Sequence, residues 1–163
     1  MTKKIIRTKN DRNYIFESLY PLQKICGEMV RKNYESPKFR RLQLILDSAL
    51  SSCPGENKVL IFCKWTRSVA TLRTKLRCLH PDVSIFKFHG DQNQGQRQKQ
   101  KNDFKNCDGP AVLVMSLGVS VGVNLQEARH AIFYELPWTD KDFEQAKSRA
   151  VRSTAGQKFS SEV

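Results

Sequence analysis

A glycine-containing polar segment, residues 116–125, follows an apolar run and has the composition of a phosphate-binding loop. Gly122 lets the backbone approach a phosphate closely, because it carries no Cβ. Ser116, Ser120 and Asn124 can donate hydrogen bonds to phosphate oxygens. The alternative interpretation is an ordinary turn between a strand and a helix.

Two further polar segments follow apolar runs and carry positive charge. Lys64 and Thr66 come after one run, and His89 and Gly90 come after another, with Arg97 a few residues on. Lysine, arginine and hydroxyl side chains at such places fit the backbone of a nucleic acid, and contacts of this kind hold position without reading sequence. A solvated basic surface is the alternative.

Arg149 and Arg152 are three residues apart, which is about one turn of a helix. Both guanidinium groups can therefore project from one end of the same helix. Taken alone, the pair is more typical of a solvated helix surface, so its interpretation depends on the surrounding motifs.

The elements that must position these residues alternate along the chain. Short apolar runs predict strands at 58–63, 83–88, 111–115 and 130–134. Helical spacing predicts a helix that starts at Ser36-Pro37 with Ser36 as its cap, a helix that Thr66 can cap, and two more over 96–106 and 141–151. Strands this apolar are buried on both faces, so the pattern predicts an α/β fold with a parallel sheet between two layers of helices. Ligands of such sheets lie beyond the carboxyl ends of the strands, where the polar segments fall.

Composition limits the class of protein. The chain has 163 residues, which is enough for one domain. Its net charge of +12 indicates affinity for a polyanion. Residues 1–41 hold eleven Lys and Arg against four acids. No apolar run approaches the roughly 20 residues of a membrane span, and the N-terminus lacks the apolar core of a signal peptide.

Cysteine and histidine usage indicates a reducing compartment and no metal site. The five cysteines (Cys26, Cys53, Cys63, Cys78 and Cys107) are widely spaced, and none belongs to a C-x-x-C pair. We expect free thiols. The three histidines are scattered, so they have no partners for a zinc site.

The order of the motifs resembles the second RecA-like lobe of superfamily-two helicases, and within that group the SWI/SNF-type ATPases. The segments that carry the resemblance are Leu22–Cys26, Ser36–Lys38, Lys58–Phe62, Phe88–Gly90 with Arg97, Leu113–Ser116, Val121–Leu125, Pro137-Trp138 and Gln145–Arg152. The Phe133–Trp138 stretch and the Leu22–Cys26 segment favour the SWI/SNF-type ATPases over other superfamily-two helicases. Gly118-Val119-Ser120 and Trp138-Thr139-Asp140 depart from the family's A-G-G and W-N-P patterns.

The resemblance implies a RecA-like three-layer lobe and a role for each polar segment. Arg149 and Arg152 would be arginine fingers that stabilise charge on a transferring phosphoryl group. Gly122, Asn124 and Gln145 would face the nucleotide cleft. The expected DNA-backbone contacts are Lys64, Thr66, His89, Gly90, Arg97, Ser116 and Ser120.

The resemblance also implies a partner lobe. The phosphate-binding G-x-x-x-x-G-K-[ST] loop and the D-E pair that holds Mg²⁺ occur nowhere in the sequence. We therefore expect residues 1–35 to form a basic arm and linking helix, and residues 36–163 a second lobe truncated at its C-terminus. ATP and Mg²⁺ would be held mainly by a first RecA-like lobe, so the chain alone is predicted to be inactive.

The resulting hypothesis is a motor lobe of an ATP-dependent double-stranded-DNA translocase that acts in chromatin remodelling, in the nucleus. Two alternatives remain open. One is a lobe of another superfamily-two DNA or RNA helicase, and the other is a non-catalytic DNA-binding or regulatory remnant.

Overall fold

The structure is a computed structural model that describes residues 20, 21, 24, 25, 28, 35–52, 57–119, 125, 128–137 and 139–151. In the last helix, the side chains of 146, 147 and 149–151 fall outside this description. The chain divides into two compact units, Met1–Arg41 and Leu42–Val163. Among the described helices, none combines the length and the apolar character needed to cross a membrane.

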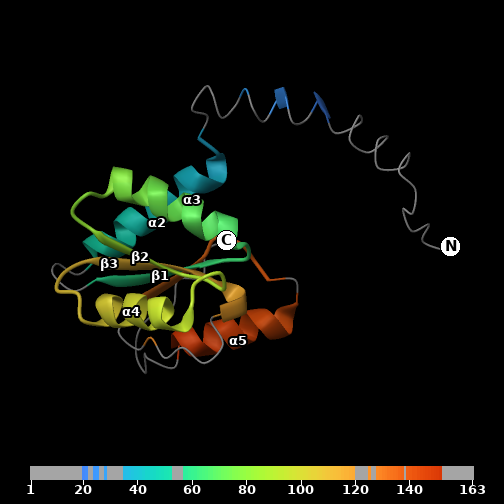
Figure 1. Cartoon of the computed structure of the whole chain (residues 1–163). Coiled ribbons are helices and arrows are strands. Elements are labelled where there is room, and N and C mark those ends of the chain that lie inside the picture. The colour runs from blue at the N-terminus through green and yellow to red at the C-terminus, as the bar shows by residue number, and fades with distance from the viewer. Residues whose placement is uncertain are drawn as a thin grey trace, which may run out of the picture. The chain divides into compact units, whose positions relative to one another are not determined.

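Helices and strands alternate along the chain (Figure 1). The elements are α2 (Pro37–Ser51), β1 (Lys58–Cys63), α3 (Thr66–Leu79), β2 (Ser84–Phe88), α4 (Gln94–Lys105), β3 (Ala111–Ser116), the short 3₁₀ helix η1 (Leu117–Val119), β4 (His130–Phe133) and α5 (Asp140–Val151). The strands coincide with the predicted ones to within one residue at each end.

The four described strands form one parallel sheet in the order β2-β3-β1-β4. β3 and β1 lie in the middle, and every residue of β3 is buried, as are Val59 to Cys63 of β1. Uninterrupted burial explains why these segments read as continuous apolar runs rather than alternating ones.

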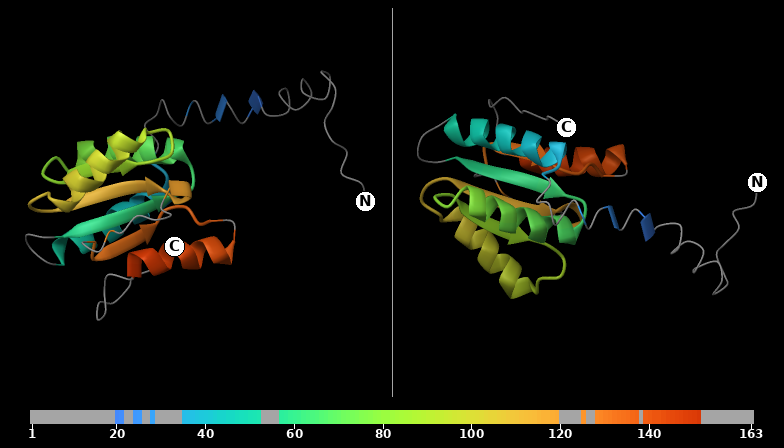
Figure 2. Two further views of the ribbon diagram at one scale, coloured as in Figure 1. Left: turned by 60° about the horizontal axis from the view of Figure 1, so that its bottom comes forward. Right: turned by 90° about the horizontal axis from the view of Figure 1, so that it is seen from above.

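Helices cover both faces of the sheet, with α2 and α3 on one face and α4 and α5 on the other (Figures 1 and 2). Val69, Leu72 and Leu76 of α3 are buried, and Phe104 is the buried anchor of α4. The ring of Phe133 has its centroid 4.8 Å from that of Phe143, which packs α5 against the sheet. The predicted α/β fold with two helical layers is confirmed.

The starts of two helices differ from prediction. Thr66 was expected to cap α3, but it is the first residue of that helix. The N-cap residue is Trp65, whose side chain forms no capping hydrogen bond. A carboxylate distant in sequence caps this helix instead. The helix α4 begins two residues earlier than expected, because Asn93 and Gln96 form a capping box.

The described residues test two further predictions, the cap of α2 and the free cysteines. Ser36 caps α2 as expected, since its Oγ accepts a hydrogen bond from the Phe39 amide at 3.2 Å. None of Cys63, Cys78 and Cys107 forms a disulfide. Cys26 and Cys53 lie outside the described residues.

Candidate nucleic-acid interface at the carboxyl edge of the sheet

The strand register brings the predicted polar segments together at one edge of the sheet. Cys63 of β1 is level with Ser116 of β3, and Phe88 of β2 is level with Met115 of β3. Lys64 and His89 directly follow β1 and β2, so both flank the end of β3. Three segments that are distant in sequence thus share the carboxyl edge, as the sequence predicted.

The loop that follows β2 also meets the beginning of the polar segment 116–125. A Cβ added to Gly90 would lie 3.7 Å from Cγ1 of Val119, in ordinary van der Waals contact. The exposed backbone of Gly90 therefore lies beside η1. A phosphate that reached this place could be approached from both segments.

His89 lies beneath this surface, with a side chain only 11 % exposed. Its amide donates to Gln92 Oε1 at 2.9 Å, and the Gln92 amide donates back to the His89 carbonyl at 3.2 Å. Burial, and then the positive charge of Lys87, lower the pKa of His89, while Asp91 opposes them. The imidazole is therefore neutral near pH 7, and its place in the fold is that of a loop support.

Ser116 is also covered, with 4 % of its surface exposed. It ends β3 in the middle of the edge, below the residues that follow the strands. Like His89, it is better placed to shape the surface than to touch a large ligand. The sequence showed which residues follow the strands but could not show how deeply each one lies.

Lys64, Trp65 and Thr66 form the exposed part of the edge that follows β1. The Trp65 side chain is 59 % exposed, and Lys64 Nζ lies 5.3 Å from the centroid of its ring. Thr66 is half-buried at the first position of α3. A cation, an aromatic face and a hydroxyl are thus available side by side, which is the chemistry of a nucleic-acid surface.

Glu135 joins the end of β4 to this edge; the sequence predicts that it follows a strand but not what its carboxylate binds. Its Oε2 accepts hydrogen bonds from the Lys64 amide at 2.8 Å and the Trp65 amide at 3.1 Å. Its Oε1 accepts from Ser68 Oγ at 2.7 Å. A carboxylate at a helix N-terminus is stabilised by the orphan amides and the helix dipole. The Lys64 and Trp65 amides, just before α3, are therefore bonded to this carboxylate.

Arg97 lies one turn into α4, and the start of that helix is held by its capping box. The Asn93 side chain accepts from the Gln96 amide at 2.8 Å, and Gln96 Oε1 accepts from the Asn93 amide at 3.2 Å. Arg97 itself is half-buried. The box orders the start of α4, which carries Arg97 in its first turn.

Several predicted site residues cannot be placed. Ser120, Gly122, Asn124 and Arg152 lie outside the described residues. Arg149 belongs to α5, but its side chain is outside the description. Gln145 is exposed on α5. The roles expected of these residues at a nucleotide remain predictions.

Within the described part of the chain, no group of three or more His, Cys, Asp or Glu side chains could hold a metal ion. The described residues of the carboxyl edge supply cationic, hydroxyl and backbone groups, and the Glu135 carboxylate among them is bonded to two amides and a hydroxyl. Their chemistry fits the binding of phosphate groups.

A family model, the helicase conserved C-terminal domain, matches residues 38–154. The chain is 33 % identical over 109 residues to the TATA-binding protein-associated factor mot1 of Schizosaccharomyces pombe, a match that covers 66 % of this chain and 6 % of that protein. It is 24 % identical over 132 residues to the ATP-dependent RNA helicase vasa of Drosophila melanogaster, covering 81 % and 19 %. The chain thus spans less than a fifth of either relative.

Solved structures share the fold. The C-terminal part of the Fun30 ATPase domain superposes with a TM-score of 0.67 at 23 % identity, covering 91 % of this chain and 53 % of that one. The C-terminal domain of the Sulfolobus solfataricus SWI2/SNF2 ATPase gives a TM-score of 0.55 at 20 % identity, covering 80 % and 58 %. The family match confirms the predicted helicase C-terminal lobe, and its fold is shared with the C-terminal domains of SWI2/SNF2-type ATPases.

Proposed function

The chain belongs to the family of the helicase conserved C-terminal domain, and from this premise we propose that it is the second motor lobe of an ATP-driven, SWI/SNF-type double-stranded-DNA translocase. In this function, the lobe grips the phosphate backbone of DNA at the carboxyl edge of its sheet. It also presents arginine fingers to a nucleotide bound on a first RecA-like lobe.

One observation carries the proposal. The ends of β1, β2, β3 and β4 converge on a single edge, where Lys64, Trp65 and Gly90 are accessible and Glu135 ties the segment after β4 to the one after β1. An edge of this composition can follow a phosphate backbone without reading bases, which is what a translocase needs.

The described geometry divides the proposed DNA-contacting residues into two groups. Lys64, Thr66, Gly90 and Arg97 supply contacts to phosphates, and Ser120 adds a further donor in the proposal. His89 and Ser116 are covered, so their role is to support the loops that carry the others.

The residues of this chain do not by themselves form a complete site for ATP and Mg²⁺. The described residues contain no metal-binding cluster, and the sequence lacks both the phosphate loop and the D-E pair. We propose that a first RecA-like lobe holds the nucleotide and its metal. Gly122, Asn124 and Gln145 then line the facing side of the cleft, and Arg149 and Arg152 reach towards the γ-phosphate.

The test of this proposal is Arg149→Ala in a protein that carries both lobes. Because an arginine finger acts mainly in the transition state, ATP turnover should fall by about three orders of magnitude while DNA affinity changes little. Arg149→Lys should restore little, since an ammonium cannot present the planar fork of a guanidinium. Lys141→Ala, an exposed change on the same helix, is the control and should leave turnover unchanged.

Two outcomes would contradict the assignment. Lost DNA binding with preserved turnover would move Arg149 to the DNA side, and no effect on either would make it a solvated surface residue. The 163-residue chain alone should hydrolyse no ATP above background, and DNA-stimulated turnover by it would also contradict the proposal.

A lobe of an RNA helicase is the second candidate, and the similarity to vasa favours it. Competition between duplex DNA and duplex RNA of the same sequence for this chain separates the two. We further propose that the protein works in the nucleus on DNA–protein complexes, which localisation of the tagged protein in its own cell would test.

A further inference from the structure

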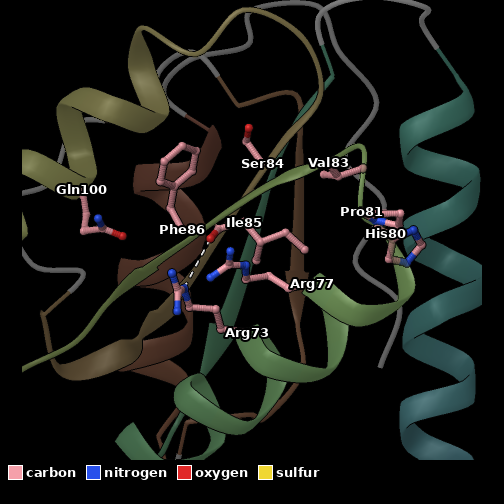
Figure 3. A pocket seen from close by; sticks show the side chains of 9 residues that line it. All are labelled: Arg73, Arg77, His80, Pro81, Val83, Ser84, Ile85, Phe86 and Gln100. Carbon is pink, nitrogen blue, oxygen red and sulfur yellow. Dashed lines mark hydrogen bonds between the residues drawn. The ribbon is translucent and has the colours of Figure 1, made fainter.

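A pocket of about 540 Å³ opens at β2, the end strand of the described sheet (Figure 3). The residues that line it are Arg73, Arg77, His80, Pro81, Val83, Ser84, Ile85, Phe86 and Gln100. They come from the second half of α3, the turn after it, β2 and the middle of α4. Since α3 and α4 cover opposite faces of the sheet, the pocket follows the outer edge of β2 from one face to the other.

The pocket has an uncompensated positive charge. Arg73 and Arg77 lie one turn apart on α3, and both point towards β2 (Figure 3). No acidic residue lines the pocket, and neither arginine forms an ion pair within the described part of the chain. Burial, and then the charge of Arg77, lower the pKa of Arg73. A negatively charged ligand would relieve this repulsion between two guanidinium groups.

The third basic residue of the lining, His80, lies near a carboxylate. His80 Nε2 lies 3.8 Å from Asp47 Oδ1 of α2. The positive charge that is available to a ligand therefore comes from the two arginines, on the α3 side of the pocket. On the α4 side, the half-buried Phe86 lines the pocket and packs edge-on against Phe104, with ring centroids 6.1 Å apart, while Ile85 is buried.

The outward-facing backbone of β2 is already bonded to side chains. Arg73 Nε donates to the Ile85 carbonyl at 3.4 Å, and the Lys87 amide donates to Gln100 Oε1 at 3.2 Å. Side chains from α3 and α4 thus cover the strand edge, which blunts pairing with another strand. A ligand at this place must be recognised through its side chains rather than by adding a strand to the sheet.

From this arrangement we propose that the β2-edge pocket is a docking site for an acidic segment of a partner protein. Carboxylate side chains of that segment pair with Arg73 and Arg77, and a neighbouring apolar side chain packs on Phe86. The guanidinium fork suits carboxylates, and a pocket of this size holds a few side chains.

A protein segment fits this place better than DNA for two reasons. The pocket is formed by the first half of β2, Ser84 to Phe86, whereas the candidate DNA-binding edge begins at His89 after the other end of that strand. The exposed part of the Phe86 ring also suits an apolar side chain, which the phosphodiester backbone does not carry. The inference does not rest on the proposed motor function.

The experiment measures fluorescence anisotropy of a labelled Glu-Glu-Asp-Leu-Asp-Glu-Glu peptide titrated with the full 163-residue chain. The variant Arg73→Gln/Arg77→Gln should weaken the peptide's affinity by about tenfold. The control variant Arg67→Gln/Lys75→Gln removes the same charge from the same helix outside the pocket, and it should change affinity by less than about twofold. Replacing the peptide's acids by Gln and Asn should abolish binding, and replacing its Leu by Gly should weaken it.

The single variant Arg77→Gln controls for misfolding of the double variant. Arg77 is exposed, and Arg73 keeps its hydrogen bond to the Ile85 carbonyl. It should give part of the loss with an unchanged circular-dichroism spectrum, and the peptide should shift the NMR amide signals of Ile85 and Phe86. Equal losses in the pocket and control variants, or no saturable peptide binding below about 1 mM, would overturn the proposal. So would displacement of the peptide by duplex DNA whose own binding depends on Arg73 and Arg77, because the pocket would then be a nucleic-acid surface.

Discussion

Glu135 accepts a hydrogen bond from the backbone amide of Lys64, 71 residues earlier in the chain, at 2.8 Å. The contact joins the segment after β4 to the loop between β1 and α3. The same carboxylate binds the next amide and the Ser68 hydroxyl, so one side chain completes the start of α3. It also places the Lys64 and Trp65 side chains on the candidate DNA-binding surface.

Glu135→Ala should lower the free energy of unfolding by about 1–3 kcal/mol, because two amides and a hydroxyl lose a charged acceptor. Urea unfolding followed by circular dichroism measures the change. Asp82→Ala, in the exposed turn before β2, is the control and should stay within about 0.5 kcal/mol of the unmodified chain. A Glu135→Ala protein as stable as this control would show that the cap contributes nothing.

The capping box of α4 yields a second stability prediction. Asn93→Ala removes the acceptor of the Gln96 amide and should cost about 0.5–2 kcal/mol. Gln94→Ala, at the next position along the chain, leaves the box intact and serves as the comparison in the same urea titration. If both variants unfold at the same urea concentration, the box is not a stabilising feature of this helix.

Stability should also decline as the pH is lowered from neutral. Burial and then the charge of Arg129 lower the pKa of His130, and burial and then Lys87 lower that of His89. Both residues are therefore neutral in the folded chain, while the unfolded chain takes up protons near the ordinary histidine pKa of about 6.5. The stability that they contribute is complete above that value and is lost as the pH falls through it towards the lowered pKa values.

Urea unfolding at about pH 7.5 and about pH 5.5 measures this effect, since carboxylates titrate mostly below the second value. The double variant His89→Asn/His130→Asn should show a smaller difference between the two conditions than the unmodified chain. An unmodified chain that is more stable at the acidic value, or a double variant with the same difference, would refute the assignment.

Local sequence signals predicted the sheet well, for a physical reason. The run from Val59 to Cys63 is apolar because both faces of β1 are covered, and that pattern is visible without the fold. The start of α4 could also have been predicted, since Asn93 followed three residues later by Gln96 is a capping-box signature. The predicted start at Gln96 overlooked it.

Other features required the folded chain. The cap from Glu135 to Lys64 joins positions 71 residues apart, and no local pattern reports such a pair. The depth of His89 depends on neighbours from other elements, as does the approach of Arg73 and Arg77 to β2. The sequence therefore predicted which segments carry the candidate site but not which side chains reach its surface.

The central claim is that the carboxyl edge of the sheet binds a DNA backbone, and the salt dependence of duplex binding tests it most directly. Anisotropy of labelled duplexes of unrelated sequence, titrated with the chain, should give similar affinities and a straight decline of log affinity with log salt. Lys64→Gln should weaken binding to every duplex and reduce the slope by about one, because one phosphate contact is lost. The control is Lys75→Gln, at an exposed position in the middle of α3, and it should leave the slope unchanged. Affinity that is independent of salt, a marked preference for one sequence, or a Lys64→Gln slope equal to that of the unmodified chain would contradict the account.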